Sequence, residues 1–266
     1  MSILDTIVAR KRQEVERNRI QYPESVLGKS PFFKMMPYSL KQSLLNPNLT
    51  GVITEFKRKS PSKGDINLTA IPDYVCSAYA RAGASALSVL TDSEFFGGSN
   101  SDLALARGFT NLPILRKDFI VDTYQIVEAR SIGADAILLI AEVLSAKEMK
   151  DFFAFAQSLG LEVLFEVHDR DSIAKLPPNA EIIGINNRNL RDFKVEINHS
   201  CELLDLLPGA AVRVAESGID SPESLISLKR MGFQAFLIGE RFMRHEAPGK
   251  AFEDFMNSVK MLENAS

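Results

Sequence analysis

The sequence of 266 residues has no tryptophan, two cysteines and three histidines, and these scarcities exclude several classes of protein. Cys76 and Cys201 form no CxxC or metal-ligand spacing, and His168, His199 and His245 are equally scattered. A zinc site is therefore not expected, and no other metal site is expected either. So few cysteines fit a reducing cytoplasm.

The sequence also lacks a strong excess of charge and a long apolar run. Its formal net charge is −3 and its isoelectric point is near 5.8, so no overall basic field would attract nucleic acid or an anionic membrane. The longest apolar run, Ala136 to Val143, contains Glu142. It is far shorter than the roughly 20 residues that a membrane-spanning helix needs. We expect neither nucleic acid nor a membrane as a partner, and any bound anion must be held locally.

From residue 50 onward, short β-branched runs alternate with longer stretches that have helix-like apolar spacing. The eight predicted strands cover residues 50–56, 85–90, 113–117, 135–140, 162–167, 181–186, 211–215 and 235–239. The clearest helices between them are Pro72 to Ala82, Asp122 to Ile132, Ala146 to Leu159 and Pro222 to Met231. A repeat of strand, helix and strand predicts parallel pairing in an α/β fold.

A doubly wound open sheet and a closed barrel would both show this alternation, and the number of strands together with a missing motif favours the barrel. Strands such as 136–140 are apolar throughout, as strands buried on both faces are. There are eight strands, and no GxGxxG follows the first of them. Four helices are expected to end at a glycine that leads into a strand, namely Gly83, Gly133, Gly160 and Gly232. The sequence therefore predicts a (β/α)8 TIM barrel.

An amphipathic helix is predicted before the barrel. Ile3 and Ile7 are apolar, and charges between and beyond them include Asp5, which a transit peptide would avoid. We therefore expect the segment to be part of the mature protein. We expect residues 1–46 to form a helical extension that packs on the top of the barrel, and residues 47–266 to form the catalytic barrel of the same structural domain.

Charged and amide side chains gather where the predicted strands end. In a barrel the active site lies at the carboxyl ends of the strands. The groups in question are Glu55, Lys57, Lys117, Glu166, Asn186 and Glu216. Alternation along the first strand directs Glu55 and Lys57 to the same face. Each group alone could be a solvated loop residue, but together they predict a site for general acid and base catalysis.

Two glycine-containing loops predict a seat for phosphate. Strand 211–215 runs into Ser217 and Gly218, and strand 235–239 ends at Gly239. Glycine permits close backbone approach, and the N–H groups of the following turn can converge on phosphate oxygens. Ser60 and Arg188 are expected to add hydroxyl and charged contacts. The alternative is a pair of tight turns that bind nothing.

Five motifs in order along the chain resemble those of the indole-3-glycerol phosphate synthases. They are Glu55 to Ser62, Pro113 to Ile120, Gly184 to Leu190, Val214 to Ile219 and Phe236 to Gly239, and the segment Ile3 to Glu14 resembles the helix that this family adds before its barrel. The resemblance implies a carboxy-lyase of tryptophan biosynthesis that needs no cofactor. Its substrate would be 1-(o-carboxyphenylamino)-1-deoxyribulose 5-phosphate, which loses carbon dioxide and water to give indole-3-glycerol phosphate.

The resemblance also implies roles for individual residues. Lys117 would be the general acid of ring closure, and Lys57 with Glu166 the acid and base of dehydration. Glu55 would orient the lysines, while Asn186 and Glu216 would contact the substrate's carboxylate or hydroxyls. The anion anchors would be Ser60, Arg188, Ser217, Gly218, Gly239 and the backbone of Glu240. The walls around the anthranilate ring would be Phe96, Phe119, Leu138, Ile140 and Leu190, which could equally be rim packing.

Glu240 departs from the family pattern, because some members have serine there. A carboxylate that pointed toward a phosphate dianion would repel it, so we expect the backbone N–H of Glu240 to serve and its side chain to point away.

Two other functions remain open. Phosphoribosylanthranilate isomerase has the same phosphate seat but typically a cysteine and an aspartate for acid and base catalysis, whereas no cysteine lies at a strand end here. A non-catalytic barrel used for binding is the second alternative, which the charged groups at five strand ends disfavour. The expected protein is a cytoplasmic monomer that acts on a small molecule, with a weak homodimer as the alternative state.

Overall fold

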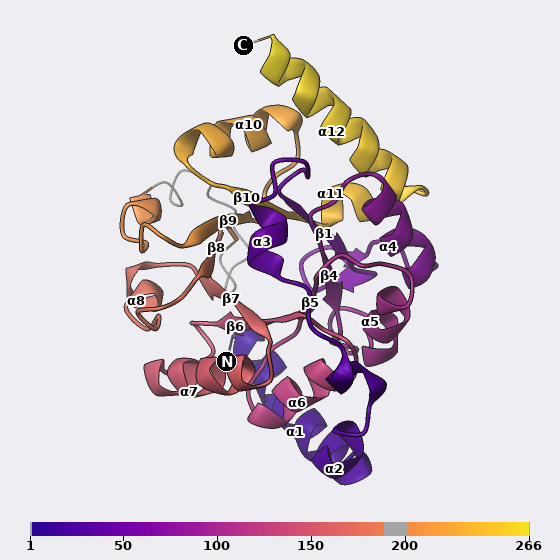
Figure 1. The fold of residues 1–266 in the computed structure, drawn as a ribbon, viewed down its shortest axis with the longest axis vertical. Helices are drawn as coiled ribbons and strands as arrows, with labels where there is room; N and C mark the ends of the chain where they lie inside the picture. The colour runs from indigo at the N-terminus through magenta and orange to yellow at the C-terminus, as the bar shows by residue number, and fades with distance from the viewer. Residues whose placement is uncertain (1, 189–201, 266) are drawn as a thin grey trace.

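The computed structural model describes residues 2–188 and 202–265, and its centre is a closed barrel of parallel strands (Figure 1). Around the barrel the order is β1-β4-β5-β6-β7-β8-β9-β10, and β10 pairs with β1. The strands are β1 (Val52–Phe56), β4 (Ala86–Leu90), β5 (Ile114–Lys117), β6 (Ala136–Ile140), β7 (Glu162–Val167), β8 (Ile182–Asn186), β9 (Val212–Glu216) and β10 (Ala235–Ile238). The predicted fold and all eight predicted strands are confirmed.

Helices between the strands surround the barrel (Figure 1). They are α4 (Pro72–Arg81), α5 (Asn100–Arg107), α6 (Thr123–Ser131), α7 (Ala146–Ser158), α8 (Arg170–Ile173), α10 (Pro222–Met231), α11 (Glu240–Met243) and α12 (Pro248–Asn264). The predicted helices correspond to α4, α6, α7 and α10. All four glycines predicted to end helices have positive φ, a conformation that glycine adopts without steric cost.

The barrel strands separate two hydrophobic cores. One core lies between the strands and the outer helices and includes Leu87 and Phe165. The other lies inside the barrel and includes Ile53, Leu115 and Leu164. Because each strand contributes alternate side chains to both cores, the strands are apolar along their length. Burial of each such side chain contributes about 1.5–3 kcal/mol to folding.

The N-terminal extension contains four helices and contacts both ends of the barrel. The helices are α1 (Ile3–Gln21), α2 (Glu24–Leu27), the 3-10 helix η1 (Pro31–Lys34) and α3 (Leu40–Leu44). Lys11 of α1 forms ion pairs with Asp92 and Asp118, which follow β4 and β5 at their carboxyl ends. Helix α1 therefore lies against the face of the barrel that carries the predicted site.

Helix α3 lies at the opposite end, over the centre of the ring of strands in Figure 1. Leu40 and Leu44 join the core inside the barrel, and Ser43 donates a hydrogen bond to the carbonyl of Ser85 just before β4. The expectation that the whole extension packs on top is therefore corrected. The two leucines need an apolar environment, which the open amino end of the barrel supplies.

A short hairpin that the sequence analysis did not predict follows β1. Its strands are β2 (Lys59–Ser60) and β3 (Gly64–Asp65), which pair antiparallel. The hairpin turns the chain back over the carboxyl end of the barrel, so that Ser60, Ser62 and Lys63 line the same cavity as the strand ends.

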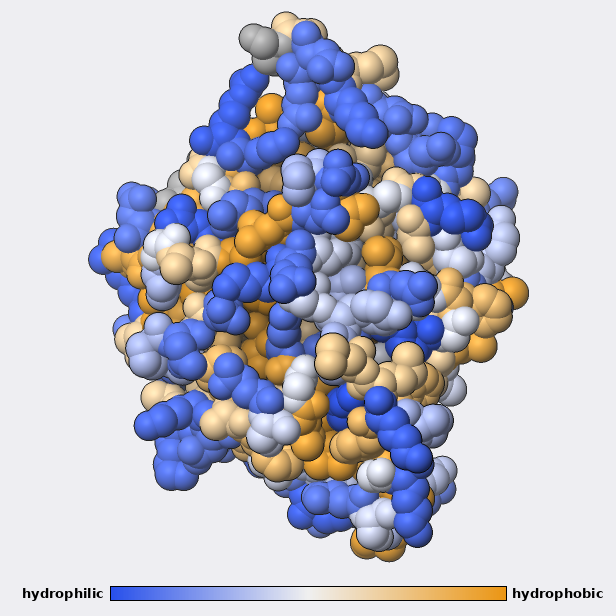
Figure 2. Space-filling model, in the orientation of Figure 1, coloured by the Kyte–Doolittle hydropathy of each residue, from blue (hydrophilic) through white to orange (hydrophobic). Residues whose placement is uncertain are grey.

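The face seen in Figure 2 is mostly hydrophilic, with hydrophobic residues in small separate groups. Within residues 2–188 and 202–265, no helix is both long enough and apolar enough to cross a membrane.

Candidate active site

The carboxyl ends of the barrel strands surround a cavity of about 290 Å³, close to the size of small-molecule sites. Every predicted site residue lines it except Leu190, which lies outside the described residues. The structure thus brings together Glu55, Lys57, Ser60, Phe96, Lys117, Phe119, Leu138, Ile140, Glu166, Asn186, Arg188, Glu216, Ser217, Gly218, Gly239 and Glu240.

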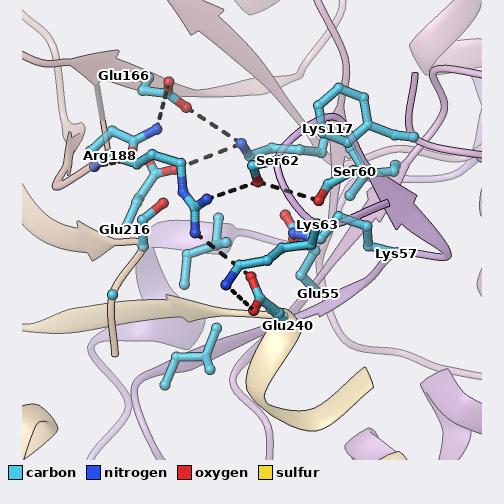
Figure 3. A pocket seen from close by; sticks show the side chains of 18 of the residues that line it. Glu55, Lys57, Ser60, Ser62, Lys63, Lys117, Glu166, Arg188, Glu216 and Glu240 are labelled. Atoms are coloured by element: carbon cyan, nitrogen blue, oxygen red, sulfur yellow. Dashed lines mark hydrogen bonds and ion pairs between the residues drawn. The ribbon is translucent and has the colours of Figure 1, made fainter. Parts of the chain in front are cut away.

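Lys117, at the end of β5, lies between two carboxylates (Figure 3). Its Nζ is 3.4 Å from Oε2 of Glu166 and 3.8 Å from Oε2 of Glu216. Asn186 donates a hydrogen bond of 3.0 Å to the other oxygen of Glu166. These side chains come from four different strands, β5, β7, β8 and β9, and each points into the barrel because of strand alternation.

Lys57 has a separate carboxylate partner. Its Nζ donates a hydrogen bond of 2.6 Å to Oε1 of Glu55. Lys57 and Glu166, the predicted acid and base, line the same cavity. Lys57 is hydrogen-bonded to Glu55, whereas Glu166 accepts a hydrogen bond from Lys117. The two lysines can therefore keep distinct roles.

Burial and mutual charge set the ionisation of this cluster. Burial would lower the pKa of Lys117, but attraction by Glu166, Glu216 and Glu55 outweighs burial and raises it. Burial would raise the pKa of Glu55, but the charges of Lys57 and Lys117 hold it below its usual value. Burial and repulsion by Glu166 raise the pKa of Glu216 well above its usual value. Protonation of Glu216 is therefore easier than protonation of a free glutamate.

Two glycines make room for the buried carboxylates. An added Cβ at Gly184 would lie 2.0 Å from Oε1 of Glu216, and one at Gly239 would lie 2.5 Å from Oε1 of Glu55. Gly239 was predicted only as a phosphate contact. The sequence analysis assigned no role to Gly184, although it is the glycine of an otherwise apolar strand.

Gly184→Ala is expected to lower kcat/KM by about 10- to 100-fold, because the new methyl group displaces the Glu216 carboxylate from Lys117. Steady-state kinetics would measure kcat/KM, and a thermal unfolding scan would show whether the variant is folded. Gly209→Ala is the matched control, since a Cβ there meets nothing within 4 Å, and it should behave as wild type. Equal activity of the two variants would contradict this account of Gly184.

The loop after β9 has the backbone of an anion-binding turn. Ser217 and the following Gly218 both have positive φ, 65° and 75°, and the N–H groups of such a turn can line an anion-binding concavity. Positive φ is uncommon for serine, and a hydrogen bond of 2.8 Å from Nδ2 of Asn187 to the Ser217 carbonyl holds this conformation. Asn187 was not among the predicted site residues, although it lies within the family motif.

Arg188 lines the same cavity as this loop and is directed toward Ser62 and Glu240 (Figure 3). It donates a hydrogen bond of 2.8 Å to the hydroxyl of Ser62, which lies 3.5 Å from the hydroxyl of Ser60. Ser62 and Lys63 are further lining residues that the sequence analysis missed. Their position directly after Ser60, in a turn rich in serine and glycine, was a usable signal.

Glu240 does not point away from the cavity, so that prediction is wrong. Its side chain lines the cavity, with Oε2 3.7 Å from Arg188 and Oε1 3.5 Å from Lys63 (Figure 3). Arg188 and Lys63 attract the Glu240 carboxylate, and this attraction accounts for its direction into the cavity.

Apolar side chains form the wall beside Lys117. The rings of Phe96 and Phe119 are 6.0 Å apart between centroids, and Leu138 and Ile140 lie in the same cavity. A flat aromatic group fits against such a wall.

Neither a metal nor a cysteine is part of this arrangement in the described part of the chain. Residues 2–188 and 202–265 hold no group of three or more His, Cys, Asp or Glu side chains placed to bind a metal ion. Cys76 is buried in α4 outside the cavity, and Cys201 lies outside the described residues. The cysteine expected of a phosphoribosylanthranilate isomerase is thus not found among the described lining residues.

Comparison with known proteins agrees with the motifs. A family model described as indole-3-glycerol phosphate synthase matches residues 4–255. A protein of that name from Bacteroides thetaiotaomicron is 42% identical and covers 97% of this chain and 99% of its own length. Another, from Campylobacter fetus, is 44% identical and covers 95% of this chain and 98% of its own length.

Solved structures of low sequence identity share the barrel fold alone. A thiamine phosphate pyrophosphorylase from Pyrococcus furiosus has a TM-score of 0.59 at 16% identity, covering 84% of this chain and 99% of its own. A mutant tryptophan synthase α-subunit from the same organism has a TM-score of 0.57 at 11% identity, covering 79% and 97%. The family model and the two relatives above 40% identity show more than the fold: the chain belongs to the indole-3-glycerol phosphate synthase family.

Proposed function

We propose that the protein converts 1-(o-carboxyphenylamino)-1-deoxyribulose 5-phosphate to indole-3-glycerol phosphate, with loss of carbon dioxide and water, in tryptophan biosynthesis. Family membership supports the reaction. The single observation that carries it is the position of Lys117, between two buried carboxylates, in a cavity that also has an aromatic wall and an anion seat.

The three parts of the cavity match the three parts of this substrate. The phosphate would bind the backbone of Ser217 and Gly218, the backbone at Gly239 and Glu240, and the side chains of Ser60 and Arg188. The Glu240 carboxylate, 3.7 Å from Arg188, would turn away from Arg188 as the phosphate takes its place. The anthranilate ring would lie against Phe96 and Phe119, with Leu138 and Ile140 beside them. The ribulose carbonyl would then face Lys117.

Lys117 would act in ring closure as the general acid. The ring carbon that bears the carboxylate attacks the ribulose carbonyl carbon, and Lys117 gives a proton to the carbonyl oxygen, which becomes a hydroxyl. The bond to the carboxylate then breaks, carbon dioxide leaves, and its electron pair restores the aromatic ring. The raised pKa keeps Lys117 protonated before each turnover.

Lys57 and Glu166 would complete the reaction by dehydration. Lys57 protonates the departing hydroxyl, and Glu166 takes a proton from the adjacent carbon, so that water leaves and the indole forms. Glu55 holds Lys57 in place, and Asn186 holds Glu166. Glu216, whose pKa is raised by burial and by Glu166, would donate a hydrogen bond to a substrate oxygen when it is protonated.

We propose a monomer that acts in the cytoplasm, and the supply of all the proposed groups by one chain supports the monomer. The test is incubation of the purified protein with the carboxyphenylamino-deoxyribulose phosphate while indole fluorescence is followed. The rise in fluorescence is expected to be proportional to enzyme concentration. The absence of product at micromolar enzyme concentration would contradict the proposal.

A further inference from the structure

Lys11 is a buried ammonium that connects the N-terminal helix α1 to two loops of the cavity. Its side chain is 1% exposed, and its Nζ lies 3.0 Å from Oδ2 of Asp92, 2.9 Å from Oδ1 of Asp118 and 3.0 Å from Oε1 of Glu14. Asp92 follows β4, and Asp118 follows β5. The carboxylates and the ammonium depend on one another, because removal of one partner of a buried ion pair leaves an uncompensated buried charge.

Each of the two loop carboxylates also fixes the backbone of one aromatic residue of the cavity. Oδ1 of Asp92 accepts hydrogen bonds from the N–H groups of Phe95, at 2.8 Å, and Phe96, at 3.2 Å. Oδ1 of Asp118 accepts a hydrogen bond of 2.8 Å from the N–H of Phe119. Lys11 therefore binds the same two groups that set the positions of the facing rings of Phe96 and Phe119.

The two carboxylates differ in how much they depend on Lys11. Asp118 has a second cation, because its Oδ2 lies 3.1 Å from Arg116, and it accepts a further hydrogen bond of 2.6 Å from Thr91. For Asp92, the ion pair found among the described residues is the one with Lys11. Loss of the ammonium should therefore release the loop that carries Phe96 more than the loop that carries Phe119.

We propose that Lys11 is a positioning residue that holds Phe96 and Phe119 together as the wall against which the aromatic ring of the substrate lies. The inference rests on the proposed function in that the ring is an anthranilate. The anion seat lies on the loops after β1, β8, β9 and β10, to which Lys11 makes none of its three ion pairs. The affinity for the ring and the affinity for the phosphate should consequently respond differently to changes at Lys11.

The test compares Lys11→Met with Lys41→Met, using anthranilate and inorganic phosphate as separate ligands in calorimetric titrations or in competition with the substrate. Lys41 is also a lysine of the N-terminal extension and forms an ion pair of 2.6 Å with Glu181, but at the amino end of the barrel. Lys11→Met should raise the Kd for anthranilate about tenfold, which is the expected effect of losing one aromatic contact. The Kd for phosphate should stay within about twofold of the wild-type value. Lys41→Met should leave both affinities at the wild-type value.

Asp92→Asn provides a second variant should Lys11→Met fold poorly. An asparagine can still accept the N–H groups of Phe95 and Phe96, and the Lys11 ammonium keeps Glu14 and Asp118, so only the link to the first loop is removed. It should show the same selective loss for anthranilate. Wild-type anthranilate affinity, or an equal loss for both ligands, would overturn the proposal. Either result can be obtained whether or not the wild-type protein makes indole-3-glycerol phosphate, so the two proposals fail separately.

Discussion

Lys117→Met should lower kcat by about 1,000-fold or more, with KM changed only a few-fold, because the variant loses both a general acid and a cation at the developing charge. Methionine has nearly the length of lysine, so the cavity keeps its shape. The phosphate and ring contacts of the proposed complex do not involve Lys117. A fall in kcat without a matching rise in KM is the signature of an interaction made in the transition state.

Lys147→Met is the matched control for this variant. Lys147 is an exposed lysine of α7 that forms an ion pair of 2.6 Å with Asp151, and it does not line the cavity. Its activity should equal that of wild type within about twofold, as for most surface changes. Near-normal turnover of Lys117→Met in the same indole fluorescence assay would remove Lys117 from the mechanism.

The barrel and most of its site could be predicted from the sequence because both depend on local patterns. A parallel strand buried on both faces is a short apolar run, and the residue after such a run must lie at one end of the barrel. This reasoning places Lys117 and Glu166 in one cavity although 49 positions separate them in the chain. No knowledge of the contacts themselves is needed.

The features that the sequence analysis missed depend on contacts between distant segments. Helix α3 closes the amino end of the barrel through Leu40 and Leu44. In the sequence, these two leucines do not differ from those of any other short amphipathic helix. The direction of Glu240 is set by Lys63, which the hairpin after β1 brings to it. The pairing of Lys11 with Asp92 and Asp118 joins segments 81 and 107 positions apart, so no local periodicity could predict it.

The division of roles between the two lysines makes the second prediction possible. Lys117 lies beside Glu166 and Glu216, whereas Lys57 is hydrogen-bonded to Glu55. Lys117 would therefore serve ring closure, and Lys57 would serve dehydration. In the proposed reaction, decarboxylation follows ring closure and precedes loss of water. A variant defective only in dehydration should therefore still release carbon dioxide.

Glu166→Gln should lower the steady-state rate of indole formation by about 100- to 1,000-fold, the usual range for loss of a general base. Glutamine keeps the length of the side chain and can still accept the hydrogen bond from Asn186, but it cannot take a proton. In a single turnover with enzyme in excess, about one equivalent of carbon dioxide should appear well before indole fluorescence. Lys117→Met should delay both signals together.

Glu162→Gln is the matched control, because Glu162 is in the same strand but at the amino end of the barrel, where it accepts hydrogen bonds from Ser39 and Lys41. It should release carbon dioxide and form indole at the wild-type rates. If Glu166→Gln delayed carbon dioxide and indole equally, Glu166 would act at or before ring closure, through its contact with Lys117. The order of the two signals thus decides whether Glu166 is the base of dehydration or a partner of the first acid.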